Sequence, residues 1–334
     1  MALDIASHLW TRRQPSNSPL PVGCEPLGQL SVVDAGVPVK VPGLCLPLQM
    51  DCLGGAEHTQ QLWWSEAPAE LSAPVVLPGI RMRHAVSGDF AWVAVDIDDD
   101  QDLLVHSELA YERILRTVRE LGRPHLLRVW NYIPRINGME SGEERYRTFN
   151  RGRRAAFRVA GYENAASVPA ACALGTQQGP LQIAVLASRQ PVITIENPRQ
   201  VSAYHYPRQY GDEPPLFSRA AWFPQAGARD LLFISGTASI VGHASWHPGD
   251  VLAQTRESLL NIEAVIEAAN QRAGKAQWSL QDLSGCVYVR HAADYAEIRA
   301  HLESRGLHRF CYLEGDICRS ELLVEIEAEA QLGN

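Results

Sequence analysis

The sequence lacks the patterns that mark membrane-spanning, secreted and nucleotide-binding proteins. No run of about 18 or more apolar residues occurs, which is the length that a transmembrane helix requires. Residues 1–20 contain no apolar core between their charges, so we expect no signal peptide. Neither GxGxxG nor a GxxxxGKS or GxxxxGKT loop is present, and we therefore expect no nucleotide cofactor.

Cysteine and histidine are present without the spacing of a disulfide framework or a zinc site. The seven cysteines are scattered and include no CxxC pair, which is typical of free thiols in a reducing compartment. His243 and His247 are four residues apart, but Pro248 and Gly249 follow at once and no third ligand stands at a recognised spacing. We expect a cytoplasmic protein that holds no metal.

Basic residues are also fewer than acidic ones. The chain has 30 Lys and Arg against 38 Asp and Glu, a net charge of −8. Because phosphate contacts require a basic face, this balance argues against a nucleic-acid partner. A local basic cluster in such a chain would instead select a small anion. Hydrophobic residues at 46% and charged residues at 20% are ordinary for a globular protein, and 334 residues favour two domains or a duplicated module.

The order of the expected elements repeats along the chain. Residues 1–80 are rich in Pro and Gly and predict short strands and turns. The first half then predicts strands and helices over 89–97, 98–121 (with the aspartates 98–100 as its cap), 126–134, 143–158, 168–174 and 182–188. The second half predicts them over 229–236, 251–270, 285–290, 294–304, 310–317 and 321–330, with 236–250 as a long loop. This order favours an α+β fold of two modules, each a mixed sheet with helices on one face.

Turn-forming residues between about 195 and 215 mark the expected boundary between the modules. We assign 1–200 to an N-terminal module with an irregular, strand-rich extension, and 201–334 to a C-terminal module. Clefts form at such junctions, so the phenol of Tyr204 and the guanidinium of Arg219 are candidate ligand contacts.

Two further elements carry groups suited to an anionic ligand. Tyr146, Asn150 and Arg153 stand at i, i+4 and i+7 and share one helical face, where an arginine fork could hold a carboxylate. A solvated amphipathic helix is the alternative. Backbone N–H groups near Gly236 could also face an anion.

The closing strand places three carboxylates on one face. Glu325, Glu327 and Glu329 alternate with apolar residues. One of them, buried in a pocket, would have a raised pKa and could act as a general acid. The alternative is a strand with one face in water.

Three ordered segments of the second half resemble the RidA/YjgF family. They are PLFSRAAW…DLLFISGTAS, QTRESLLNIEAVIEAA and VEIEA, within residues 214–332. The resemblance implies modules of chorismate-mutase-like fold, which in that family usually assemble as trimers. Two fused modules could supply such contacts within one chain, so we expect a monomer.

A resemblance to the chorismatases covers residues 85–332. It rests on RVWNYIPRIN, RYRTFNRGRRAAF, GTASIVGH…HPGD and CRSELLVEIEA. It implies cleavage of the enolpyruvyl ether of chorismate with release of pyruvate, without metal or cofactor. By position, Glu325 corresponds to the family's catalytic glutamate, and the residues expected to hold the substrate are Tyr146, Arg153, Tyr204 and Arg219.

Two positions bear on the product that the resemblance implies. Cys318, seven residues before Glu325, stands where the aromatising branch has a cysteine. That branch favours glycine at the place of Ala238. The expected product is 3-hydroxybenzoate, with 4-hydroxybenzoate as an additional product and hydrolysis to a dihydroxycyclohexadiene carboxylate left open.

Two other function classes remain open at this point. An imine deaminase of the RidA type carries an arginine before the same glutamate, and the corresponding position here is Phe310. A non-catalytic module that binds an aromatic metabolite is the other, because related folds host different functions.

Overall fold

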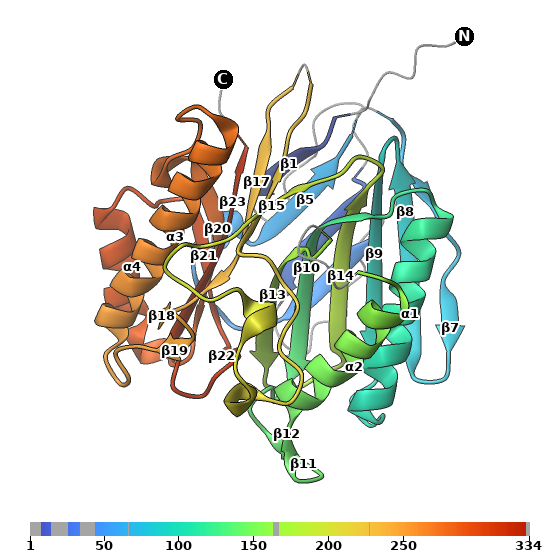
Figure 1. Cartoon of the computed structure of the whole chain (residues 1–334), viewed down its shortest axis with the longest axis horizontal. Coiled ribbons are helices and arrows are strands. Elements are labelled where there is room, and N and C mark those ends of the chain that lie inside the picture. The colour runs from blue at the N-terminus through green and yellow to red at the C-terminus, as the bar shows by residue number, and fades with distance from the viewer. Residues whose placement is uncertain are drawn as a thin grey trace.

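Two large sheets, each covered on its outer side by two helices, form the body of the protein (Figure 1). The computed structural model describes residues 8–14, 26–33, 44–65, 67–162, 167–226 and 228–331. Cys24 lies outside the described residues. No described helix has both the length and the apolar character needed to cross a bilayer.

The first sheet carries α1 and α2. Its main strands follow the order β13-β10-β14-β9-β8. The elements of this module are β6 (Glu70–Leu71), β7 (Val75–Leu77), β8 (Ile80–Ser87), β9 (Phe90–Ile97), α1 (Leu103–Glu120), β10 (His125–Pro134), β11 (Met139–Glu140), β12 (Glu143–Glu144), α2 (Arg145–Val159), β13 (Ala170–Thr176) and β14 (Leu181–Ser188).

The second sheet carries α3 and α4. Its main strands follow the order β16-β17-β23-β20-β21. The elements of this module are β15 (Ile193–Ile195), β16 (Ala220–Phe223), β17 (Leu231–Thr237), β18 (Ile240–Val241), β19 (Ala244–Ser245), α3 (Val251–Ala273), β20 (Leu283–Val289), α4 (Tyr295–Ser304), β21 (Phe310–Glu314), β22 (Asp316–Ile317) and β23 (Val324–Gln331).

The two modules repeat the same topology. In each sheet the last main strand along the chain, β14 or β23, lies in the middle. The third and fourth main strands in chain order pair in parallel: β10 with β13, and β20 with β21. The other main pairs are antiparallel. The predicted α+β class and the two modules with helices on one face are therefore confirmed.

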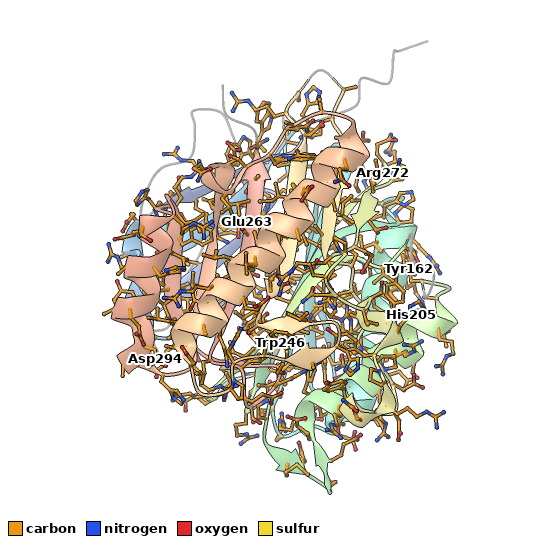
Figure 2. The ribbon with its side chains drawn as sticks, turned by 60° about the vertical axis from the view of Figure 1, so that its left-hand side comes forward. Tyr162, His205, Trp246, Glu263, Arg272 and Asp294 are labelled. Atoms are coloured by element: carbon orange, nitrogen blue, oxygen red, sulfur yellow. The ribbon has the colours of Figure 1, made fainter. Side chains whose placement is uncertain are left out.

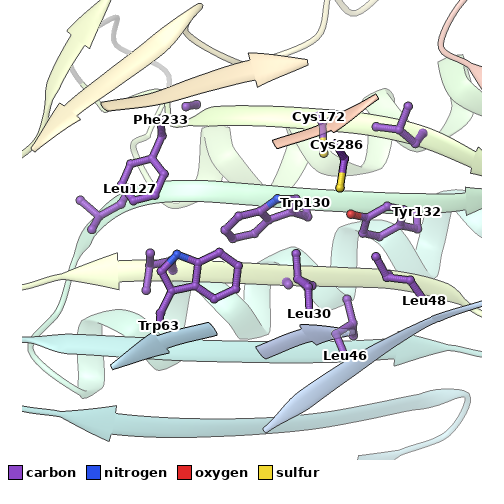
Figure 3. Close-up of a cluster of buried hydrophobic side chains, with 14 of the residues drawn as sticks. Leu30, Leu46, Leu48, Trp63, Leu127, Trp130, Tyr132, Cys172, Phe233 and Cys286 are labelled. Atoms are coloured by element: carbon purple, nitrogen blue, oxygen red, sulfur yellow. The ribbon is translucent and has the colours of Figure 1, made fainter. Parts of the chain in front are cut away.

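A third sheet, built from the N-terminal region, encloses the interior between the two modules. It consists of β1 (Trp10–Gln14), β2 (Gly28–Val33), β3 (Cys45–Gln49) and β5 (Gln60–Trp64) in the order β1-β5-β2-β3. One buried cluster draws residues from all three sheets, as Figure 3 shows for Trp63, Trp130 and Phe233. The rings of Trp63 and Trp130 lie 4.9 Å apart. The irregular extension is thus part of the core.

Two short strands from one half of the chain pair with the sheet formed by the other half. β4 (Cys52–Gly54) extends the second sheet beside β21, and β22 extends the first sheet beside β13. β15, which precedes residue 200, pairs with β16 of the second sheet. The division at residues 200 and 201 stays a prediction.

The structure corrects two local predictions, the cap of the first helix and the loop 236–250. The cap of α1 is Asp102, whose Oδ1 accepts a hydrogen bond from the Val105 N–H at 2.9 Å, and not the aspartates 98–100. The expected loop 236–250 contains the hairpin of β18 and β19, because Ile240 and Val241 pair with Ser245 and Ala244. Prediction from periodicity does not resolve strands of two residues.

Candidate active site

A cavity of about 380 Å³ lies where the two modules meet. Its wall comes from the start of α2, the connecting segment 200–219, the end of β17 with the β18–β19 hairpin, residues 318–321 and the start of β23. In Figure 2, Trp246 marks the region of this hairpin beside the lower end of α3, and His205 marks the connecting segment. Of the residues predicted from the sequence, those that line the cavity are Tyr146, Arg219, Gly236, Ala238, Cys318 and Glu325.

Glu325 is a buried acid at the floor of this cavity, with 4% of its surface exposed. Its neighbours on β23, Val324 and Ile326, pack against the helices, so strand alternation turns Glu325 toward the interior. A Cβ atom on Gly236 would lie 1.9 Å from Oε1 of Glu325, so a larger residue at this position would displace the Glu325 carboxyl. Within the described part of the chain, no hydrogen bond or ion pair reaches the Glu325 carboxyl.

The environment of Glu325 favours its neutral form. Burial raises the pKa of Glu325 to about 8, the charge of Glu327 adds to this rise, and Arg128 opposes it. A carboxyl group with such a pKa carries a proton at neutral pH and can donate it. The group therefore suits general acid chemistry.

Glu327 and Glu329 share the inward face with Glu325, as the alternation predicts, but they have partners. Glu327 pairs with Arg128 at 2.6 Å and accepts a hydrogen bond from the Tyr288 hydroxyl at 3.0 Å. Glu329 accepts a hydrogen bond from Oγ1 of Thr11 at 2.8 Å. All three carboxylates are buried, so the alternative of a strand face in water is wrong.

The polar face of α2 also turns inward. Asn150 and Arg153 are 5% and 3% exposed, so the interpretation of a solvated helix is wrong for this face. Tyr146 lines the cavity, and its pKa is raised, mainly by burial, while Asn150 and Arg153 act in the opposite direction. Arg153 is not among the cavity-lining residues; its guanidinium lies over the rings of Tyr111 and Phe157, and its Nε and Nη2 have no hydrogen-bond partner in the described chain.

Arg219 enters the cavity from the segment that precedes β16. Its Nη2 donates to the Val201 carbonyl at 2.9 Å and to the Tyr206 hydroxyl at 2.8 Å, and its guanidinium lies over the Phe217 ring. Nε of Arg219 has no partner among the described residues. The side chain is thus held in place while part of its charge remains available to an anion.

Cys318 and Ala238 border the same cavity. Burial, followed by the nearby Glu325, raises the pKa of the Cys318 thiol to about 12, which keeps it protonated. The Ala238 carbonyl accepts a hydrogen bond from Asn261 at 3.1 Å, which ties this turn to α3. Both side chains are therefore fixed, neutral parts of the wall.

Tyr204 is not among the residues that line the cavity. It packs against the first module's core, with its ring 4.6 Å from that of His205. Tyr210 and Arg319, which were not predicted from the sequence, also line the cavity. Arg319 directly follows Cys318 in the CRSELLVEIEA segment, and this position next to a predicted site residue could have indicated it.

The described residues contain no group of three or more His, Cys, Asp or Glu side chains placed to hold a metal ion. The cavity offers one protonated acid, Glu325, and two guanidinium groups that form no ion pair in the described chain, those of Arg219 and Arg319. Its wall also carries Glu144, which pairs with Arg147, and Glu321. Such a site can bind an anion with more than one negative charge and protonate a carbon or oxygen atom next to Glu325.

Comparisons with known proteins agree with this geometry. Residues 62–187 match the domain family described as chorismatase FkbO/Hyg5-like, N-terminal. A 3-hydroxybenzoate synthase from Streptomyces hygroscopicus is 35% identical over 284 residues, which cover 81% of each chain. A chorismatase from Streptomyces rapamycinicus is 35% identical over 279 residues, or 81% of this chain and 82% of that protein.

A crystal structure of a chorismatase is similar over almost the whole length. The TM-score is 0.82 at 30% sequence identity, and the match covers 97% of this chain and 98% of the other. The similarity therefore includes both modules and the third sheet.

Proposed function

The chain belongs to the chorismatase family, and on that premise we propose that it converts chorismate into 3-hydroxybenzoate and pyruvate without a metal or cofactor. The observation that carries this proposal is the buried, unpaired carboxyl of Glu325 in a cavity whose wall also contributes guanidinium groups. Chorismate is a dianion with an enol ether, so it needs cations for its carboxylates and an acid for its methylene carbon.

Glu325 is the proposed general acid. It donates its proton to the terminal methylene of the enolpyruvyl group, whose electron pair forms the new C–H bond. The adjacent carbon then becomes an oxocarbenium centre beside the ether oxygen. Arg219 holds the pyruvyl carboxylate in its ionised form, and that negative charge offsets the developing positive charge. Tyr146, with Arg153 behind it, is proposed to hold the ring side of the substrate, together with Tyr204 in the connecting segment.

The product depends on which oxygen attacks next. Chorismate equals hydroxybenzoate plus pyruvate in atoms, so the aromatising route needs no net water. For 3-hydroxybenzoate, the ring's 4-hydroxyl oxygen loses its proton and adds to the cationic carbon, and the bond from that carbon to the C3 oxygen breaks. The C4–O bond then breaks as C3 loses its proton, so the transferred oxygen becomes the keto oxygen of pyruvate, the C3 oxygen takes a proton as the phenol, and one proton returns to Glu325. Addition of an external water would give the dihydroxycyclohexadiene carboxylate instead. Cys318 at the wall supports the aromatising route, and Ala238 in place of glycine is the reason to look for 4-hydroxybenzoate beside the 3-isomer.

The imine deaminase alternative is not part of this proposal. Phe310, at the position where those enzymes have an arginine, is 2% exposed and packs in the core between the second sheet and its helices. The Phe310 side chain has no group that could bind a carboxylate.

The test is an incubation of the purified protein with chorismate. Pyruvate is followed with lactate dehydrogenase and NADH, and the aromatic products are separated by chromatography from the same sample. Pyruvate with an equal amount of 3-hydroxybenzoate is the expected result. Pyruvate with the dihydrodiol alone would overturn the product, and absence of pyruvate would overturn the function.

We also propose that the protein acts as a monomer in the cytoplasm. The third sheet closes the interior between the modules within one chain, which supports a monomer. The six described cysteines are free thiols, which supports a reducing compartment. A mass of one chain in light scattering is expected, and a trimer would contradict it.

A further inference from the structure

Arg319 presents a partly unpartnered guanidinium to the cavity. It lines the cavity directly after Cys318, and its Nη2 atom is buried without a hydrogen-bond partner in the described chain. Leaving a buried N–H of a charged group unpaired is costly, since such a group loses its hydration. A ligand oxygen at this place would remove that cost.

The rest of the Arg319 side chain is held rigidly. Nη1 donates to the His243 carbonyl at 2.9 Å and to Oγ of Ser245 at 3.1 Å. The guanidinium lies 3.8 Å from the centroid of the Tyr210 ring, whose hydroxyl is 3.2 Å from Nδ1 of His243. A group that is already ordered loses little conformational entropy when it binds a ligand.

Arg319 and Arg219 form one cationic pair in the wall. Both guanidinium carbons lie near the Tyr206 ring, at 5.3 Å and 5.6 Å from its centroid. Neither side chain has an ion pair within the described residues. The other arginine that lines the cavity, Arg147, lies 3.4 Å from Glu144 and is already paired.

We propose that Arg319 binds the ring carboxylate of the substrate, which Arg219 leaves free, and thereby makes the site selective for a dianion. This inference rests on the proposed function, in which Arg219 holds the pyruvyl carboxylate. Arg153 is not among the residues that line the cavity, whereas Arg319 presents its guanidinium at the wall. Two cations that form no ion pair in the described chain, both beside the Tyr206 ring, match the two negative charges of chorismate.

The experiment measures binding by calorimetry in a Glu325→Gln background, where turnover does not interfere. The ligands are chorismate and its two monoamides, one at the ring carboxyl and one at the pyruvyl carboxyl. Arg319→Gln is expected to weaken chorismate binding roughly tenfold to a hundredfold, the value of one charge-assisted contact. The same factor is expected for the pyruvyl monoamide, and no loss is expected for the ring monoamide.

The matched control is Arg299→Gln, which removes an exposed arginine that lies over Tyr295 on α4. It should leave all three affinities unchanged. An equal loss for both monoamides would show that Arg319 only supports the β18–β19 hairpin, and would overturn the assignment. A loss that vanishes for the pyruvyl monoamide alone would also overturn it, because Arg319 would then share the carboxylate of Arg219.

The two proposals fail in different ways. Release of pyruvate by the wild type with unchanged chorismate binding in Arg319→Gln would overturn the Arg319 inference alone. Binding that depends on Arg319 as expected, without release of pyruvate by the wild type, would overturn the proposed function and leave the inference standing. No binding of chorismate would overturn both.

Discussion

Glu325 and Glu327 stand two residues apart on β23 and are buried to almost the same degree, yet their surroundings are opposite. Glu327 faces Arg128 at 2.6 Å and the Tyr288 hydroxyl at 3.0 Å, between the three sheets. Glu325 faces the cavity and has no such partner, and its pKa rises to about 8. Burial alone therefore does not distinguish a structural carboxylate from an acid. The presence or absence of a paired cation does.

The arginines near the two glutamates differ in the same way: those in the cavity wall beside Glu325 lack an ion pair, and the one beside Glu327 has one. Arg128 is satisfied by Glu327 and by the Ile234 carbonyl at 3.1 Å. Arg219 and Arg319, which line the cavity, form no ion pair in the described chain, and each keeps one nitrogen without a hydrogen-bond partner. These two guanidinium groups can therefore bind an anionic ligand without first breaking an ion pair.

The change expected to have the largest effect is Glu325→Gln. It removes the acidic proton and preserves the shape of the side chain, so chorismate cleavage should fall by about 10²–10⁴-fold. Pyruvate release measures the loss, and circular dichroism checks that the fold is retained. Activity within a few fold of wild type would remove Glu325 from the mechanism and end its distinction from Glu327.

The pH dependence of stability gives a second test of the same carboxyl. Its pKa is about 8 in the folded protein against 4.5 as the ordinary value. The stability that comes from the neutral form is fully present below about pH 4.5 and is lost as the pH rises to about 8. Across that window the wild type should lose about 1.4 kcal/mol of unfolding free energy per pH unit that Glu325→Gln does not lose. Parallel urea-unfolding profiles of the two proteins from pH 5 to 8 would contradict the raised pKa.

Glu327→Gln should act on stability more than on chemistry. It leaves Arg128 buried without its carboxylate, which costs about 3–5 kcal/mol of unfolding free energy. The folded fraction should keep most of its activity at pH 6, because Glu327 lies about 6.5–7 Å along the strand from Glu325 and does not donate the proton. Loss of the Glu327 charge also lowers the pKa of Glu325, so the fall in activity at alkaline pH should begin at a lower pH. A stable but inactive variant would exchange the roles of the two residues.

Arg153→Lys and Arg128→Lys compare an arginine that has no ion pair in the described chain with one that pairs with Glu327. Arg153 lies behind Tyr146 and outside the residues that line the cavity, and a lysine cannot reproduce its planar guanidinium. Arg153→Lys should therefore act through Tyr146 and raise KM for chorismate by up to about tenfold, less than the loss expected for Arg319→Gln. Arg128→Lys should instead lower the melting temperature, and Arg116→Lys, an exposed change on α1, should do neither. The same melting-temperature loss at Arg153 as at Arg128, with an unchanged KM, would make Arg153 a structural residue.

The smallest expected effect is a change in product ratio. Cys318→Ala enlarges the cavity beside Glu325, so water should reach the cationic centre and part of the product should become the dihydrodiol. Cys45→Ala makes the same deletion at a buried position in β3 and should leave the ratio unchanged. Chromatography of the products decides between them. An unchanged ratio in Cys318→Ala at full rate would show that this side chain does not control the access of water.

The periodicity of the sequence was sufficient to predict which side chains share one face of β23 and one face of α2. Alternation in 324–331 placed Glu325, Glu327 and Glu329 together, and helical spacing placed Asn150 and Arg153 together, because both patterns depend on backbone geometry alone. The repeated element order predicted the two modules for the same reason. The family resemblance then indicated which of the three glutamates to examine first.

Only the tertiary structure decided what those faces meet. A polar strand face has the same alternation whether water or other sheets cover it. The burial of Glu325 depends on Cys172 in the first sheet and on Gly236 in β17, whereas Glu329 meets Thr11 of the third sheet. Likewise Tyr206, Tyr210 and Arg319 come from segments about a hundred residues apart, and no local pattern joins them. Pairing of charge is a property of neighbours in space, which is why the sequence determined the candidates and the fold determined which of them remain unpaired.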